Sequence, residues 1–363
     1  MTIDLSYTAV APLLPSLTSD LDLTHAMGGL LIGLYGIGML IGSYPALRLA
    51  AWLGLVPATI VGLGLVVIGP LTFAFSSSFD VLCLGRFCGG FGDAITMTSI
   101  LAIASTAGGR ERRGAAIGMV YSGAFTGGML GPLIGSAAEA FGRTIIFGLL
   151  ALVQLVIAGF VTRLPTLPPG PVAGLRTTLG YLRSGRALIA LSITSIPPFG
   201  LGIFVVSGSY RISESGGSSL MIAIAFSGMA GLYVVTSPTL GRISDERGRR
   251  QPIIALLLLA VFPLVLLALT TQPLPTVALI IIGGTLFTLV GGPGFALFSD
   301  LILERGGTTV EASFLKNLNW GLSAALGSII AGLFHGAAGA EASFLFLAAL
   351  LMVSASVVAR STR

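Results

Sequence analysis

Long apolar segments alternate with short polar connections along the whole chain. A stretch of about 20 apolar residues can cross a bilayer as a helix, because lipid offers the backbone no hydrogen-bond partner. Twelve stretches fit this description, and they cover residues 1–17, 26–46, 54–75, 79–103, 114–138, 144–162, 185–207, 217–240, 252–271, 275–298, 309–334 and 340–358. The pattern predicts an all-α integral membrane protein with about twelve transmembrane helices. The first stretch spans only about 25 Å at 1.5 Å per residue, so we expect its helix to be truncated.

Two related halves are expected from a proline-rich connection and from repeated small residues. The predicted division is an N-terminal six-helix bundle, a cytoplasmic linker and a C-terminal six-helix bundle, which cover residues 1–163, 164–184 and 185–363. Gly127 and Gly131 in the fifth segment occupy the same places as Ser323 and Gly327 in the eleventh. Parallel repeats of this kind predict two pseudo-symmetric bundles with a substrate path between them.

Composition and charge narrow the class of protein. Hydrophobic residues make up 54% of the chain and charged residues 9%, whereas an ordinary soluble domain has roughly 25% charged residues. Most arginines fall in the even-numbered connections or at the C-terminus, and cytoplasmic loops carry the excess of basic residues. We expect a multi-pass protein of the plasma membrane with both termini in the cytoplasm. The net charge of +5 then reflects contact with anionic lipid, and nucleic-acid binding is not expected.

A short charged run between the eighth and ninth segments is the most polar part of the chain. It contains Gly241, Asp245, Gly248 and Arg249, and it resembles the signature loop of the major facilitator superfamily of secondary transporters. The resemblance implies a latch on the cytoplasmic side, where Asp245 meets the positive N-terminal end of the fifth helix and Arg112 adds attraction. The corresponding loop of the first half lacks the carboxylate.

The fifth segment contains a regular series of small residues. Gly118, Gly127, Gly131, Pro132 and Gly135 resemble the motif of superfamily members that export their substrates. Small residues let helix backbones approach closely, and proline removes a helix hydrogen bond. The resemblance implies that this helix packs against the eighth and seals the cleft toward the cytoplasm. The alternative is that the series serves only helix packing.

The fourth segment carries two charges inside the apolar region. Arg86 and Asp93 are seven residues apart and share a helix face. Charged side chains inside a membrane are costly and mark functional sites. Asp93 is the first candidate for a proton carrier, because a low dielectric disfavours the charged form of a carboxyl group. The alternative is a structural ion pair with Arg86, and Asp4 is a further intramembrane acid.

The eleventh segment carries a polar stripe that includes Lys316, Asn317 and Trp320. A helix turned to lipid would not tolerate this stripe, so we expect it to line the cleft. Lys316 would attract an anionic group or pair with an acid, and Trp320 would stack on the ligand. Tyr121 occupies the matching place in the first half. The alternative for Lys316 is that it extends toward the cytoplasmic headgroups.

Other chemistry has little support in the sequence. No nucleotide-binding loop, catalytic triad or paired-carboxylate motif is present, so we expect neither an enzyme nor a cofactor. His25 and His335 are interpreted as interfacial residues at external helix ends. No further histidine, cysteine or acid lies near them at ligand spacing in the sequence, and a metal site is not expected.

These features together predict a transporter that works by alternating access. The most favoured function is proton-coupled export of a small organic or lipophilic compound by a functional monomer in the lipid bilayer. One alternative is uptake of an organic anion or other small solute, with Arg86 and Lys316 as the anion-binding pair. A second alternative is a membrane sensor that does not transport.

Overall fold

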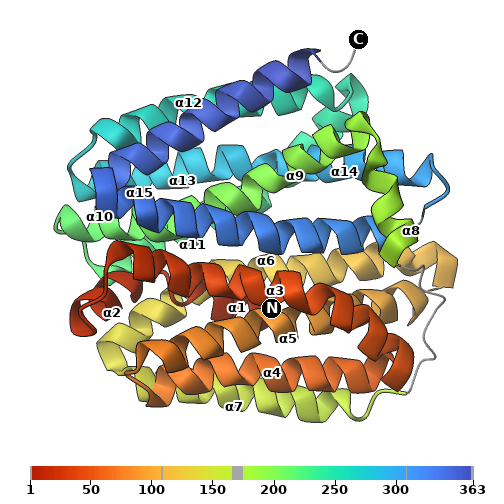
Figure 1. Ribbon diagram of the computed structural model, residues 1–363, viewed down its shortest axis with the longest axis horizontal. Coiled ribbons are helices and arrows are strands. Elements are labelled where there is room, and N and C mark those ends of the chain that lie inside the picture. Colours follow the sequence, from red (N-terminus) through yellow and green to blue (C-terminus); the bar gives the residue numbers. More distant parts are fainter. Residues whose placement is uncertain (1, 108, 166–174, 308, 361–363) are drawn as a thin grey trace.

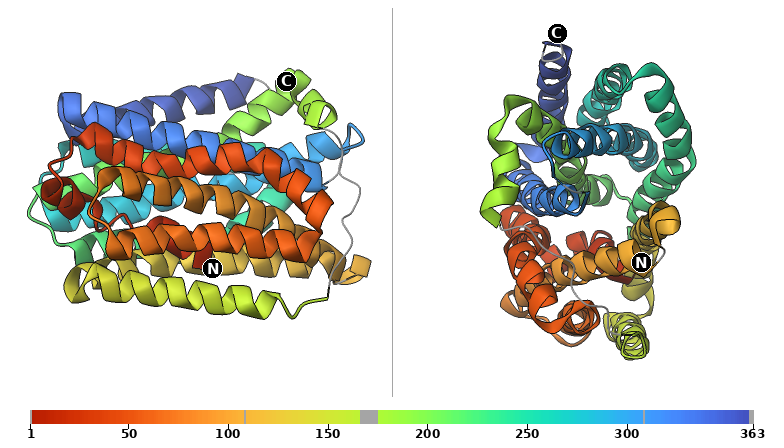
Figure 2. Two further views of the ribbon diagram at one scale, coloured as in Figure 1. Left: turned by 60° about the horizontal axis from the view of Figure 1, so that its bottom comes forward. Right: turned by 90° about the vertical axis from the view of Figure 1, so that its right-hand side faces the viewer.

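The computed structural model is all helical and describes residues 2–107, 109–165, 175–307 and 309–360. Within these ranges the side chains of residues 2–3, 105–107, 109–115, 117, 176, 309–310 and 313 are not described. The helices form two groups, which lie below and above one another in Figure 1 and are seen end-on in the right-hand view of Figure 2. We refer to α1–α7 as the N-terminal half and to α9–α15 as the C-terminal half.

The N-terminal half begins with a broken helix. Its elements are α1 (Thr2–Thr8), α2 (Leu14–Asp20), α3 (His25–Leu53), α4 (Leu55–Phe75), α5 (Phe79–Ala107), α6 (Gly109–Phe141) and α7 (Arg143–Val161). The prediction of one continuous helix over residues 1–17 was wrong. Turns occupy residues 9–13, and the two prolines of this region explain the interruption, because proline cannot donate the backbone hydrogen bond of a helix interior.

The C-terminal half contains longer helical runs with local breaks. Its elements are α9 (Gly185–Ile203), the π-helical segment η2 (Phe204–Gly208), α10 (Ser209–Glu214), α11 (Ser219–Arg247), α12 (Arg250–Leu269), α13 (Pro273–Leu289), α14 (Gly291–Leu303) and α15 (Thr309–Arg360). Ala338 and Gly339 interrupt α15, and Gly339 has a φ of +78°. Between the halves lie α8 (Leu175–Gly180) and a 3-10 turn, Tyr181–Arg183. Part of the expected linker, residues 166–174, lies outside the described residues, so the domain boundaries stay predictions.

The number of membrane crossings agrees with the apolar pattern. Over the described ranges, nine helical runs are long and apolar enough to cross a membrane. The run in α15 is broken in the middle and therefore accounts for two crossings. Helix α6 and the broken α1–α2 segment add one crossing each, which brings the number to about twelve. The prediction of an all-α membrane protein with about twelve crossings in two six-helix bundles is therefore confirmed.

The same kind of helix contact occurs in both halves, as the repeat predicts. A Cβ on Gly131 of α6 would lie 2.6 Å from the carbonyl oxygen of Leu5 in α1. A Cβ on Gly327 of α15 would overlap the carbonyl oxygen of Phe199 in α9. The fifth crossing thus packs on the first as the eleventh packs on the seventh, and glycine at each place permits close backbone approach.

Close contact between α3 and α5 holds the centre of the N-terminal half. A Cβ on Gly90 would overlap the carbonyl oxygen of Tyr35, whereas a Cβ on Gly89 would lie 3.4 Å from the Tyr35 ring, an ordinary contact. We expect Gly90→Ala to lower the free energy of unfolding by about 1–3 kcal/mol through overpacking. Gly89→Ala is the matched control and should raise it by up to about 1 kcal/mol, because alanine favours the helix.

Thermal unfolding of both glycine variants in detergent tests this contact. Equal melting temperatures for Gly90→Ala and Gly89→Ala would contradict the close approach of α3 and α5.

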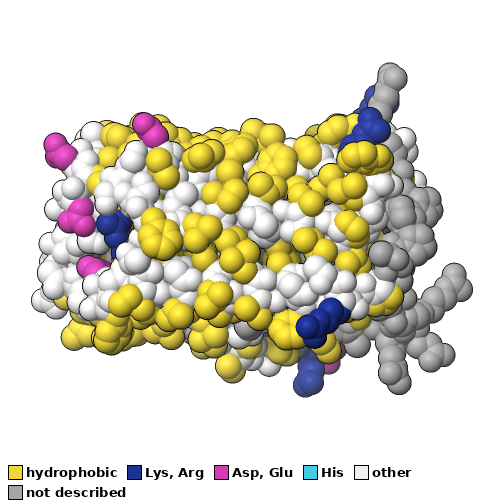
Figure 3. Space-filling model, turned by 90° about the horizontal axis from the view of Figure 1, so that it is seen from below, with side chains coloured by type: hydrophobic (Ala, Val, Ile, Leu, Met, Phe, Trp, Pro, Cys, Tyr) yellow, Lys and Arg dark blue, Asp and Glu magenta, His cyan; other side chains and the backbone are white. Residues whose placement is uncertain are grey.

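Charged side chains gather at the two ends of the molecule, and the sides between them are apolar. On the face drawn in Figure 3, hydrophobic groups cover the side, most carboxyl groups gather at the left end with one basic group among them, and the other basic groups lie toward the right end with a carboxyl group beside them. Figure 1 shows that α2 and α10 lie at the left end, which we call the acidic end, and α8 lies at the right end, the basic end. An apolar belt between two polar ends is the form expected of a protein surrounded by lipid.

Candidate functional site

A cavity of about 370 Å³ lies between the two halves. This volume is within the range of small-molecule sites. The N-terminal half contributes residues of α1, α3, α5 and α6, and the C-terminal half contributes residues of α9, α11, α13, α14 and α15. Most of the lining is apolar or aromatic. Among the described residues, the lining side chains that carry or can carry charge at neutral pH are Asp4, Asp93 and Lys316.

Asp93 faces the cavity and is held by a tyrosine. Its side chain is 6% exposed, and its Oδ2 accepts a hydrogen bond of 3.0 Å from Tyr35 Oη. Its other oxygen, Oδ1, is buried and has no hydrogen-bond partner among the described residues. A buried carboxyl group with one free oxygen can accept a proton there without losing its bond to Tyr35.

Arg86 does not pair with Asp93. Its guanidinium donates to the carbonyl oxygens of Leu31, Tyr7 and Ile32 at 3.2–3.4 Å. The same group lies over the rings of Tyr7 and Tyr35, 5.1 and 4.9 Å from their centroids. Over the described part of the chain no ion pair joins Arg86 to an acid, so the ion-pair alternative was wrong. Backbone carbonyls and aromatic faces replace the carboxylate as its partners.

Tyr35 connects the two charged groups of α5, and the sequence interpretation missed it. Its ring lies under Arg86 while its hydroxyl group binds Asp93. Tyr7 packs against Tyr35 with ring centroids 4.8 Å apart, and both tyrosines line the cavity. The only sign of its role in the sequence was the presence of a tyrosine in the glycine-rich segment 26–46. Its partner lies 58 residues away on another helix, which local spacing cannot reveal.

Asp4 also lines the cavity, from the short helix α1. Figure 1 shows α1 in the central part of the bundle. Thr8 lies one turn after Asp4 in α1. Its hydroxyl group donates a hydrogen bond of 3.1 Å to the Asp4 carbonyl oxygen and contacts the Gly128 carbonyl oxygen of α6 at 3.3 Å. These bonds fix α1 against α6. The cavity therefore contains two carboxyl groups from different helices, Asp4 and Asp93.

Lys316 and Tyr121 meet across the two halves. The Lys316 Nζ lies 4.5 Å from the ring centroid of Tyr121 in α6 and 4.8 Å from that of Phe295 in α14. All three side chains line the cavity. The structure thus places Lys316 in the cleft between two aromatic faces, as the first interpretation of the polar stripe expected. Lys316 is half-buried, and a cation–π contact is worth about 0.5–2 kcal/mol, depending on its exposure to water.

The rest of the polar stripe divides between the cavity and the helix interface. Asn317 and Trp320 line the cavity, and Trp320 packs edge-on against Tyr7 with centroids 5.4 Å apart. Asn319 is instead buried against α9, where its amide accepts from Ser195 and donates to Thr194. Trp320 therefore contacts the opposite half in this conformation.

The small residues of α6 serve mainly contacts within the N-terminal half. Gly131 and Gly135 face the backbone of α1, and added Cβ atoms there would meet Leu5 and Ala9. Gly127 and Pro132 are buried, and a Cβ on Gly118 would meet nothing within 4 Å. The expectation that this series packs on the eighth helix was wrong for Gly131 and Gly135, because their face is turned to α1. Contact with α11 comes from other residues of α6, since Ser227 donates to the Met129 carbonyl oxygen at 2.6 Å.

The predicted cytoplasmic gate lies at the C-terminal end of α11. Asp245 is exposed and forms no ion pair within the described residues. Arg249 pairs instead with Asp300 of α14. Gly241 is half-buried, and Gly248 ends the helix with a φ of +80°, a conformation that favours glycine. The side chain of Arg112 lies outside the described residues, so the latch between α11 and α6 stays a prediction.

A second polar group lies at the acidic end, apart from the cavity. His25 and His335 both contact Glu214, at 3.6 and 2.8 Å. Spacing along the chain gave no reason to expect a metal site here. The three residues come from helices far apart in the sequence and meet only in the folded protein.

Comparison with known proteins agrees with the fold and the cavity. Residues 1–315 match the family described as Major Facilitator Superfamily. An uncharacterized MFS-type transporter, YtbD of Bacillus subtilis, is 25% identical over 334 residues, which cover 88% of this chain and 82% of that protein. A chloramphenicol resistance protein of Streptomyces lividans is 24% identical over 370 residues, which cover 96% of this chain and 90% of that protein.

A solved structure shows the same fold over the full length. The bacterial homologue of the human lysosomal transporter Spinster, in an inward-facing and occupied conformation, superposes with a TM-score of 0.78 and 15% identity. The match covers 100% of this chain and 94% of that one. Since the family match spans most of the chain, this protein belongs to the major facilitator superfamily and is a secondary transporter, not an enzyme.

Proposed function

We propose that this protein exports a small organic, lipophilic compound in exchange for protons. The observation that carries the proposal is the cavity between the halves, which is mostly apolar yet contains the buried carboxyl groups Asp4 and Asp93. Apolar and aromatic walls suit a lipophilic solute. Carboxyl groups inside a membrane protein commonly carry protons. Relatives named for chloramphenicol and multidrug resistance support export.

Uptake of an organic anion through Arg86 and Lys316 is less well supported. Arg86 already binds three carbonyl oxygens and two aromatic rings, and it is not among the described residues that line the cavity. Among the described residues, Lys316 is the only cation that lines the cavity, and an anion there would also meet the carboxyl groups of Asp4 and Asp93. This charge balance favours a neutral or cationic compound.

In the proposed orientation the protein lies in the plasma membrane with its basic end in the cytoplasm. The concentration of arginine at that end supports this choice. At the acidic end, Thr18 Oγ1 and Tyr210 Oη lie 2.7 Å apart and Ser136 Oγ and Ser219 Oγ lie 3.4 Å apart, each pair joining the two halves. We infer a conformation closed toward the outside. One chain supplies the whole cavity, which supports a functional monomer.

Transport in liposomes tests the proposal directly. Purified protein is reconstituted, a pH gradient is imposed, and movement of radiolabelled chloramphenicol and of a lipophilic dye is measured together with proton flux. Solute movement against its gradient, with protons moving the opposite way, is expected. Equal flux with and without the pH gradient would contradict proton coupling. Absence of any solute movement across a broad panel of compounds would contradict export of this class.

The contact between Lys316 and Tyr121 should contribute to transport. We expect Tyr121→Leu to slow transport several-fold, because loss of the ring removes a cation–π contact of up to about 2 kcal/mol. Tyr121→Phe keeps the ring and should retain transport. Lys316→Met should resemble Tyr121→Leu, and the double variant should be no slower than either one. Additive losses in the same liposome assay would show that the two side chains act independently.

The gate residue Asp245 should favour the state closed toward the cytoplasm. A carboxylate at a helix N-terminus is worth about 0.3–2 kcal/mol, so Asp245→Asn should raise the population open to the cytoplasm up to several-fold. Thiol labelling of a cysteine placed in the basic half of the cavity, such as Phe295→Cys, reports this population. The neighbouring exposed acid Glu246 provides the control Glu246→Gln. Equal labelling in both variants would argue against the latch.

A further inference from the structure

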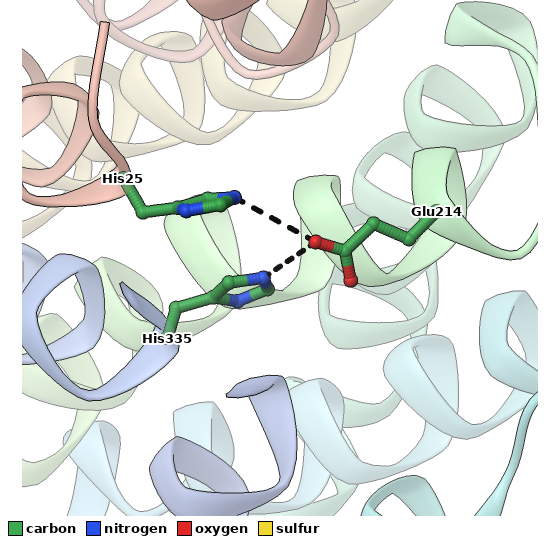
Figure 4. A group of neighbouring side chains, drawn as sticks. All are labelled: His25, Glu214 and His335. Atoms are coloured by element: carbon green, nitrogen blue, oxygen red, sulfur yellow. Dashed lines mark hydrogen bonds and ion pairs between the residues drawn. The ribbon is translucent and has the colours of Figure 1, made fainter. Parts of the chain in front are cut away.

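Three side chains with metal-binding groups converge at the acidic end, outside the cavity (Figure 4). His25 is the first residue of α3, Glu214 is the last residue of α10, and His335 belongs to α15. Figure 4 shows the two imidazole rings side by side, with both rings directed at the Glu214 carboxylate. The ring centroids are 4.6 Å apart and nearly parallel, with an interplanar angle of 29°. His25 comes from the N-terminal half, and the other two come from the C-terminal half.

The distances suit a single small cation. Nε2 of His335 lies 2.8 Å from Glu214 Oε1, and Nε2 of His25 lies 3.6 Å from the same oxygen. Ligand atoms of the three residues all lie within 4.8 Å of one another. In a tetrahedral zinc site with bonds of about 2.0–2.2 Å, the ligand atoms are roughly 3.3 Å apart. Small side-chain rotations would therefore bring the three groups into coordination.

The surroundings hold these groups in place. The side chain of His335 is only 2% exposed, and its Nδ1 is buried without a hydrogen-bond partner among the described residues. The Tyr210 ring packs against both imidazoles, with centroid distances of 4.6 and 5.0 Å. The packing directs His335 Nε2 toward Glu214 Oε1, which is the orientation that a metal ligand at this place requires.

The local charge also favours a cation. The nearby Arg211 guanidinium is paired with Glu341 at 3.0 Å, so Glu214 is not its ion-pair partner. The Glu214 side chain is 48% exposed, which leaves room for water as a further ligand. Two imidazoles and one carboxylate are a donor set typical of zinc and similar divalent transition metals.

We propose that His25, Glu214 and His335 bind a divalent transition metal ion of the Zn²⁺ class and that this ion clamps the two halves together at the acidic end. The ligands come from both halves, so the ion stabilises the conformation in which the halves touch there. Opening toward the acidic end would move His25 away from the other two ligands. The three residues do not line the cavity, so metal binding can be measured without substrate and without a pH gradient.

Zinc binding to the purified protein tests the site itself. The full chain is purified without a histidine tag, with Cys83→Ser and Cys88→Ser so that thiols do not bind metal. Zn²⁺ is titrated by calorimetry, and Mg²⁺ serves as a hard-cation control. One ion per chain is expected. Each of the variants His25→Asn, Glu214→Gln and His335→Gln should weaken Zn²⁺ binding at least about tenfold. Even the loss of a residue that only hydrogen-bonds to a metal ligand lowers metal affinity about 10–100-fold. Asp20→Asn is the matched control, because Asp20 is an exposed acid at the end of α2, at the same end of the molecule, and this variant should bind normally.

Two outcomes would overturn the metal site. One is the absence of saturable Zn²⁺ binding, which would leave a hydrogen-bonded group only. The other is equal binding by the three ligand variants and the Asp20→Asn control. His335 is buried, so its replacement can disturb folding; the more exposed His25 and Glu214 keep the test decisive.

Thiol labelling tests the clamp separately. Ser136 is 8% exposed and lies between the halves at the acidic end, so a thiol in Ser136→Cys reacts when this end opens. In the protein without its native cysteines, Zn²⁺ should slow labelling of Ser136→Cys several-fold, and His25→Asn should abolish this effect. Zinc that binds but leaves the labelling rate unchanged would contradict the clamp. Neither measurement requires transport, so a failure here is distinct from a failure of the proposed export.

Discussion

Replacement of Asp93 by asparagine is expected to abolish accumulation driven by a pH gradient. Asparagine has nearly the same shape, and its carbonyl oxygen can accept the hydrogen bond that Tyr35 Oη donates to Asp93 at 3.0 Å. An amide cannot carry a proton through the transport cycle. Flux coupled to the pH gradient should fall to the level of empty liposomes, while the melting temperature and substrate binding stay close to those of the unchanged protein.

The control for Asp93→Asn is Asp80→Asn, which removes an exposed carboxylate from the first turn of the same helix. It should leave transport unchanged. Tyr35→Phe removes the hydroxyl donor while keeping the ring under Arg86, so it should impair transport less than Asp93→Asn does. Normal proton-coupled flux through a stable Asp93→Asn protein would exclude Asp93 as the carrier. Asp4, the other carboxyl group of the cavity, would then be the next candidate.

Replacement of Arg86 by alanine is expected to cause the largest loss of stability. The guanidinium donates to three backbone carbonyls and lies over the rings of two adjacent tyrosines, and the residue is 3% exposed. Alanine would leave a cavity and would remove all of these contacts, at a cost of about 2–5 kcal/mol. Arg86→Lys should recover only part of this loss, because an ammonium group cannot reproduce the planar fork and its stacking.

Thermal unfolding in detergent measures this effect, with Arg163→Ala as the control. Arg163 is exposed and also lies over an aromatic ring, 5.3 Å from the Phe160 centroid. Its removal should change the free energy of unfolding by no more than about 0.5 kcal/mol. The double variant Arg86→Ala with Asp93→Asn should be no more stable than Arg86→Ala. Rescue by the second change would instead show that the two charges compensate one another.

The sequence by itself determined the membrane class, the number of crossings and the relation between the halves. These depend on the length of apolar runs and on repeated small residues, both of which are local properties of the chain. The broken first crossing escaped prediction although its prolines are visible, because its apolar composition is continuous across the break. The polar stripe of Lys316, Asn317 and Trp320 was also visible, since residues three to four apart share a helix face.

Only the tertiary structure decided which groups are partners. Helical periodicity placed Arg86 and Asp93 on one face of α5. Tyr35 of α3 lies between them, with its ring under Arg86 and its hydroxyl group bonded to Asp93, so the two charged groups do not pair with each other. Gly131 and Gly135 were predicted to pack against α11, but they pack against α1. His25, Glu214 and His335 are far apart in the chain and meet only when α3, α10 and α15 come together. Spacing along one helix fixes the direction in which a side chain points, whereas its partner depends on how different helices pack.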